Sequence, residues 1–150
     1  MKLIKKILAA SAIAIAAPTM WTTPAMAEDF PLIAGSYTEM SGIFVQDGGS
    51  LAYAQFLAGQ WKKEQEFAKS KGWISDYHIY QNVNARDGEP NLYLATTFQR
   101  IVDAVEGERR NKEYEAWDRS TNAERDAASS NRAKFRTLKG SMMLVELKVR

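Results

Sequence analysis

The sequence of 150 residues contains no cysteine and only one histidine, His78. Without cysteine, a thiolate metal site, a redox Cys-x-x-Cys pair, a catalytic cysteine and any disulfide bond are excluded. A single histidine excludes a metal site made of several imidazoles and any mechanism that needs two of them. None of the nine glycines forms a G-x-G pair, and the G-x-S-x-G and H-E-x-x-H motifs are absent. The nucleotide-binding fingerprint and two common hydrolase motifs are therefore excluded.

Residues 1–27 have the three parts of a secretory signal peptide. Three lysines and no acidic residue precede a run of Ile, Leu and Ala with one Ser over the 11 residues Ile7–Ala17. Ala25 and Ala27 then place small residues where a signal peptidase recognises them, so we expect cleavage between Ala27 and Glu28. A membrane-spanning helix needs about 20 apolar residues. The segment therefore predicts export of residues 28–150 as a soluble domain, to a bacterial periplasm or outside the cell.

Removal of residues 1–27 changes the sign of the net charge. The whole chain has a formal net charge of +2, and residues 28–150 have −1 because the removed segment holds three lysines and no acid. The cationic surface that favours nucleic acid or an anionic membrane is then missing. We therefore expect neither of them as a partner. Residues 28–150 are long enough to form one domain that its core alone stabilises.

The hydrophobic pattern predicts four strands in residues 28–150. The first lies within Leu32–Gln46, where Gly42–Gln46 is the best portion and the polar stretch Ser36–Ser41 is either strand or loop. The other three are expected at Trp73–Asn82, at Leu92–Phe98 and at Ser141–Arg150. The second and third are separated by a short loop rich in turn residues, so they should pair as an antiparallel hairpin.

Helices are predicted between these strands. Ser50 is a good N-cap for a helix over Leu51–Ser70, and Gly72 follows its end. The next helix begins near Arg100, and beyond Gly107 charge pairs replace its apolar stripe. These pairs have the acid first at i,i+4 and are Glu106–Arg110, Glu108–Lys112 and Glu115–Arg119. Thr121 and Glu124 form a capping box for a further helix to about Leu138.

The predicted order is β-α-β-β-α-β with an extra or broken helix before the last strand, which is the ferredoxin-like, split βαβ arrangement of an α+β protein. One recognisable pattern spans the first helix and the start of the second strand. It consists of Tyr53, Trp61-Lys62 and Glu64, followed by Lys71–Tyr77. On this pattern the chain resembles exported members, without assigned activity, of the dimeric α+β barrel superfamily. The resemblance implies a homodimer in which two such sheets pair to close a barrel. Members of that superfamily include cofactor-independent monooxygenases, isomerases and haem-degrading proteins, but a shared fold does not transfer a reaction.

His78 is the first candidate catalytic residue. Alternation along its strand places it on one face with Asp76 and Tyr80, and Tyr93 and Thr97 on the neighbouring strand can join that face. If the opposite face packs on the helices, this face looks into the barrel and lines a small-molecule site with aromatic walls. His78 would then act as a general base or as an axial haem ligand. The alternative is a half-exposed strand histidine among ordinary polar neighbours.

Glu64 is the second candidate. The helical pattern places its carboxyl amid Phe56, Leu57, Trp61 and Phe67. A dry carboxyl has a raised pKa, which suits a general acid or base. The alternatives are that Lys63 or a donor on a strand pairs with Glu64, or that a rotated helix exposes it to solvent. If Glu64 and His78 lie on opposite faces of the sheet, they cannot act together.

These residues support two classes of function. The first is a homodimeric domain that binds a small apolar or aromatic molecule, with Asp76, Tyr80, Tyr93 and Thr97 as ligand-binding residues, or that has a structural role. The alternative is a cofactor-independent oxygenase or isomerase that acts on a small aromatic-like substrate, with His78 as base. No metal is expected, and haem bound through His78 is the one cofactor considered.

Overall fold

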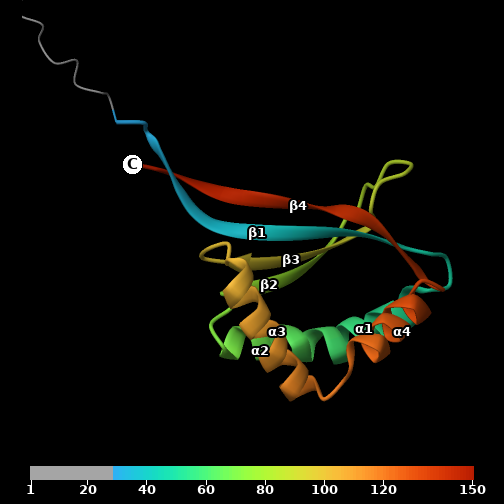
Figure 1. Ribbon diagram of the computed structural model, residues 1–150. Coiled ribbons are helices and arrows are strands. Elements are labelled where there is room, and N and C mark those ends of the chain that lie inside the picture. Colours follow the sequence, from blue (N-terminus) through green and yellow to red (C-terminus); the bar gives the residue numbers. More distant parts are fainter. Residues whose placement is uncertain (1–28) are drawn as a thin grey trace, which may run out of the picture.

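The computed structural model describes residues 29–150, and the predicted signal peptide with its cleavage site lies outside the described residues. Four strands form one antiparallel sheet in the order β2-β3-β1-β4, with the bounds β1 Leu32–Val45, β2 Asp76–Gln81, β3 Leu92–Phe98 and β4 Arg136–Val149. The helices lie on one face of this sheet (Figure 1), with the bounds α1 Ser50–Phe56, η1 Leu57–Trp61, α2 Lys62–Ser70, α3 Ala104–Asp118 and α4 Asn122–Arg132.

This α+β architecture is compatible with the predicted ferredoxin-like fold. Two helices, α3 and α4, stand where an extra or broken helix was expected before the last strand. The β2–β3 hairpin is antiparallel, and β3 has the predicted bounds. No helix among residues 29–150 is long and apolar enough to cross a membrane.

Strand β1 is central and longer than its best-predicted portion. Its polar stretch Ser36–Ser41 is strand, because β1 pairs with β3 from Tyr37 to Ile43 and with β4 along most of its length. Hydrogen bonding to two neighbours stabilises an extended backbone that the polar side chains alone do not favour. The alternative left open by the sequence is thereby resolved.

The elements α1, η1 and α2 form one long helix from Ser50 to Ser70, close to the predicted Leu51–Ser70. Gly72 follows with a φ of +67°, as expected of a residue after a helix end. The predicted Ser50 cap is wrong, because the Gly49 carbonyl accepts the first helical bond from Tyr53 N–H at 3.0 Å and no side chain caps this end. The sequence also did not predict the π-helical turn η1 in the middle of the helix.

Two other predicted starts are too early. β2 begins at Asp76 and not at Trp73, because Trp73 N–H donates to the Ala68 carbonyl at 3.0 Å and so belongs to the end of the long helix. α3 begins at Ala104 and not near Arg100. The side chain of Asp103 caps it by accepting from the Glu106 N–H at 2.8 Å.

The capping box of Thr121 and Glu124 is confirmed at the start of α4. The helix ends at Arg132 and not near Leu138, and β4 begins at Arg136 and not at Ser141, because residues 136–138 pair with residues 43–45 of β1. The predicted pairs Glu106–Arg110 and Glu108–Lys112 are present at 2.7 and 3.3 Å. The third is wrong: Glu115 pairs with Arg125 at 3.0 Å, because Arg119 leaves the helix with a φ of 57°.

The buried core lies between the long helix and the sheet. Its centre is formed by Ile43, Tyr53, Leu57 and Trp61, each exposed by 7% or less. Leu92 and Leu94 of β3 pack against this cluster from the sheet. The opposite face of the sheet carries no second layer within residues 29–150 (Figure 1).

Candidate functional site

The two faces of β2 have different surroundings. The ring of Tyr77 meets the ring of Trp61 edge-on, with centroids 5.4 Å apart, so Tyr77 faces the long helix. Side chains alternate along a strand, and Asp76, His78 and Tyr80 therefore project from the opposite face. The face of β2 opposite His78 therefore packs on the helices, which is the condition on which the His78 hypothesis depends.

The strand register gathers the other predicted residues on that same face. Across the β2–β3 pair, Asp76 lies opposite Thr97, and Tyr80 lies opposite Tyr93. Residues directly opposite in an antiparallel pair share a face. From β1 and β4 the same face receives apolar and hydroxyl side chains. We call this surface the open face, defined by Thr38, Met40, Asp76, His78, Tyr80, Tyr93, Ala95, Thr97, Met142 and Leu144.

His78 is held by an acidic neighbour on its own strand. Its Nε2 lies 3.2 Å from Oδ2 of Asp76, and both side chains are about half exposed. Oδ1 of Asp76 accepts from Lys69 Nζ at 3.2 Å and from the Tyr77 N–H at 2.9 Å. These bonds, that of Lys69 first, lower the pKa of the Asp76 carboxyl. With the carboxylate beside Nε2, Nδ1 is left for a ligand, which suits a base or a hydrogen-bonding group.

Sequence reasoning missed the apolar part of the open face. Met142 and Leu144 are exposed by 48% and 45%, and they lie opposite Met40 and Thr38 of β1. A signal was present, because residues 142–145 are four consecutive apolar residues. A run of consecutive apolar residues is typical of a strand that is covered on both faces. Alternation of apolar and polar residues instead predicts a strand that is covered on one face.

Glu64 does not join this site. It lies on α2 in the helical layer, whereas His78 projects from the far side of the sheet. Oε1 of Glu64 accepts from Gln60 Nε2 at 3.0 Å, so its partner is neither Lys63 nor a strand donor. Beside it is a cavity of about 490 Å³ with a mainly polar lining that includes Tyr114 and Arg132. The surroundings of Glu64 are therefore more polar than the helical pattern predicted, and the two candidates cannot act on one substrate.

Tyr114 is the perturbed group of this second cavity. Burial, followed by the nearby carboxylate of Glu64, raises the pKa of its phenol well above the usual range. The Arg125 guanidinium lies 5.3 Å from the Tyr114 ring and pairs with Glu115 at 3.0 Å. Tyr114 therefore stays a neutral hydrogen-bond donor at all ordinary pH values and does not serve as a base.

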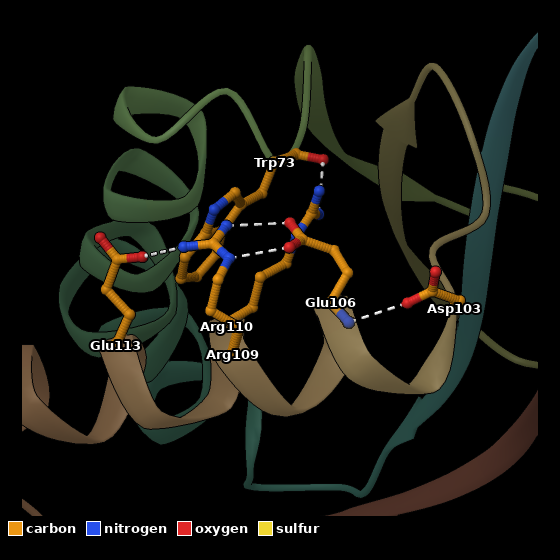
Figure 2. A network of polar contacts seen from close by, with 6 residues as sticks. All are labelled: Trp73, Asp103, Glu106, Arg109, Arg110 and Glu113. Atoms are coloured by element: carbon orange, nitrogen blue, oxygen red, sulfur yellow. Dashed lines mark hydrogen bonds and ion pairs between the residues drawn. The ribbon is translucent and has the colours of Figure 1, made fainter.

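A network of charged groups fixes the first half of α3 (Figure 2). The Glu106 carboxylate accepts from Arg109 Nε at 2.8 Å and from Arg110 Nε at 2.7 Å. Arg109 reaches onward to Glu113 at 2.9 Å, and the Arg110 guanidinium lies 5.6 Å from the ring of Trp73. The network thereby ties α3 to the segment that leads into β2.

We expect Glu106→Gln to lower the thermal midpoint above pH 4.5 and to have a much smaller effect at pH 2, where Glu106 is half protonated in the folded protein. Arg109, followed by Arg110, lowers the pKa of Glu106 from 4.5 to about 2. A depressed pKa stabilises the fold above the unfolded value, and this contribution is lost as pH falls through the folded value. Melting curves of both proteins between pH 2 and pH 7 test this. Glu108→Gln is the control, because its ion pair with Lys112 is largely exposed and should contribute less. A constant difference at all pH values would contradict the prediction.

Comparison with family models, with curated proteins and with solved structures finds no match to this chain. Among residues 29–150, no three His, Asp or Glu side chains are grouped so that they could hold a metal ion.

Proposed function

We propose that the protein is an exported homodimer whose open faces meet and enclose a site for a small apolar or aromatic molecule. The observation that carries the proposal is the apolar character of a sheet face without a covering layer. Met142, Leu144 and Phe44 on that side are exposed by 48%, 45% and 38% in the single chain. Apolar surface of this extent is characteristic of an interaction site.

The far ends of β1 and β4 support a second copy as the occupant. Residues 32–36 of β1 pair only with β4, so this part of the sheet is a two-stranded ribbon that extends past β3 (Figure 1). A two-stranded ribbon is marginal by itself in water. Ile33, opposite Lys148 on the side of the open face, is exposed by 42%, and Leu147 and Val149 on the other side of the ribbon are exposed by 57% and 79%. A two-fold axis sets the same apolar surface on both sides of an interface, so each copy would cover the other.

The interior of such a dimer would contain the predicted ligand-binding residues. Tyr80 is 48% exposed in the single chain, and its ring centroid lies 5.7 Å from that of His78. Tyr93 lies opposite Tyr80 on β3. Two phenol rings and an imidazole form walls on which a flat apolar molecule can pack, with a few polar groups to orient it.

Export of the full-length chain from a bacterial host tests compartment and assembly together. We expect an N-terminus at Glu28 in the exported protein and a light-scattering mass of twice the processed chain. A retained leader would contradict export. A monomeric mass at every concentration tested would contradict the dimer and with it the enclosed site.

The contact between His78 and Asp76 favours the second candidate function, a cofactor-independent oxygenase or isomerase. A histidine oriented by a carboxylate is a suitable general base for proton abstraction. Oxygen uptake with a panel of small phenols and quinols tests the oxygenase form. His78→Ala should abolish uptake and leave the dimer mass intact, whereas Asn84→Ala in the exposed β2–β3 loop should change neither. Uptake that persists in His78→Ala would remove His78 from the mechanism.

A further inference from the structure

Arg136, the first residue of β4, is a buried charge without a counter-ion. Its exposed fraction is 9%. Within residues 29–150, no carboxylate lies within ion-pair distance of its guanidinium. Its Nε is buried without a hydrogen-bond partner, and its Nη2 has only a long bond of 3.4 Å to Ser129 Oγ. Burial of an unpaired cation is strongly unfavourable unless an anion neutralises it.

A second guanidinium adds to this positive charge. Arg132, one turn earlier at the end of α4, stacks on the Phe56 ring at 4.3 Å and also has a buried Nε without a partner. Burial, followed by the repulsion from Arg136, lowers the pKa of Arg132. Glu64, which lines a cavity with Arg132, partly offsets this effect, so the excess positive charge is at Arg136. The arrangement therefore suits a negatively charged ligand.

Arg136 lines a cavity at the junction of α4 and β4, and its Nη2 lies 3.4 Å from the hydroxyl of Ser129, another lining residue. The cavity has a volume of about 340 Å³ and no acidic residue in its lining, which is formed by Ser129, Ser130, Ala133, Arg136, Thr137 and Leu138. The two serines of α4 offer hydroxyls beside a planar donor group. This is the donor set that recognises the oxygens of a carboxylate or phosphate group.

We propose that this cavity binds a small oxyanion, a carboxylate or a phosphate group, through Arg136 and the hydroxyls of Ser129 and Ser130. Arg136 lies opposite Val45, and its guanidinium is 5.9 Å from the ring of Tyr53, so the site lies on the helical side of the sheet. The open face and its proposed dimer are on the other side. The anion site therefore does not depend on the proposed function.

Thermal melting of the full-length chain in inorganic phosphate, in acetate and in chloride at equal ionic strength tests the site. A ligand that binds only the folded state stabilises it by RT ln(1 + [L]/Kd), so the melting midpoint rises with ligand concentration. We expect phosphate or acetate to raise the midpoint above its value in chloride, and the one with the larger shift identifies the anion class. Arg136→Lys keeps the charge but loses the planar fork of the guanidinium. The dissociation constant for the anion should therefore rise about tenfold or more in this variant.

Two further variants make the result decisive. Ser129→Ala with Ser130→Ala should weaken binding severalfold even if Arg136→Lys fails to fold. Arg86→Met is the matched control, because Arg86 pairs with Glu89 and is 85% exposed, and its anion response should equal that of the wild type. A wild-type midpoint that is equal in all three salts would overturn the proposal. So would a dimer that dissociates in Arg136→Lys without any anion response in the wild type, because the partner of Arg136 would then be a carboxylate of the second copy.

Discussion

Replacement of Met142 and Leu144 by lysine is expected to convert the proposed dimer into a monomer. Each lysine would place a charge on the open face, and the two-fold axis would place a second copy of that charge in the same interface. Burial of unpaired charges costs several kcal/mol. A loss of about 4 kcal/mol in the free energy of dimerisation raises the dimer dissociation constant about a thousandfold. Light scattering should therefore show half of the wild-type mass.

The fold of the monomer should survive this change, because both side chains are about half exposed in the single chain. An unchanged circular dichroism spectrum would demonstrate it. The matched control adds two lysines to an exposed helical face, as Ala123→Lys with Ala127→Lys on α4, and should keep the wild-type mass. If the Met142 and Leu144 variant remains dimeric, the open face is not the interface.

Trp61→Ala is expected to reduce the free energy of unfolding by about 3–5 kcal/mol. Trp61 is 7% exposed, belongs to the central cluster and meets the Tyr77 ring edge-on. Its removal leaves a cavity between the long helix and β2 that the rigid layers fill only in part. Domains of this size are stable by about 5–15 kcal/mol, so the variant should unfold at a much lower urea concentration.

Urea titrations of both proteins at one fixed protein concentration measure this effect, because the apparent stability of an associating protein depends on its concentration. Leu51→Ala is the control, because Leu51 is 71% exposed on the same helix, and its effect should stay within about 0.5 kcal/mol. A loss below about 1 kcal/mol in Trp61→Ala would show that the helix does not pack on the sheet through this residue.

The locally encoded features were predictable from sequence. The Thr121 and Glu124 capping box needs only residues three apart, and Gly72 needs only its own backbone freedom. The alternation of Leu92–Phe98 was sufficient for the bounds of β3. In the first two cases the stabilising contacts lie within a few residues of one another, whereas β3 is marked by its alternation although its pairing partners in β1 are distant in sequence.

The burial of Arg136 and the polar surroundings of Glu64 were not predictable in this way. Arg136 lies beside Tyr53 of the distant helix α1, and Glu64 shares a cavity with Tyr114 of α3 and Arg132 of α4. The π-helical turn at Leu57–Trp61 changes the direction of the side chains that follow it. A regular period of 3.6 residues therefore misplaces Glu64.

The sequence by itself determined that Asp76, His78 and Tyr80 share a face, because side chains alternate in every strand. It did not determine what that face meets. The packing of Trp61 against Tyr77 decided this, since it directs the other side of β2 toward the helices. The same tertiary contact placed His78 and Glu64 on opposite sides of the sheet. Which face is buried depends on contacts between distant segments, and these exist only once the long helix lies across the sheet.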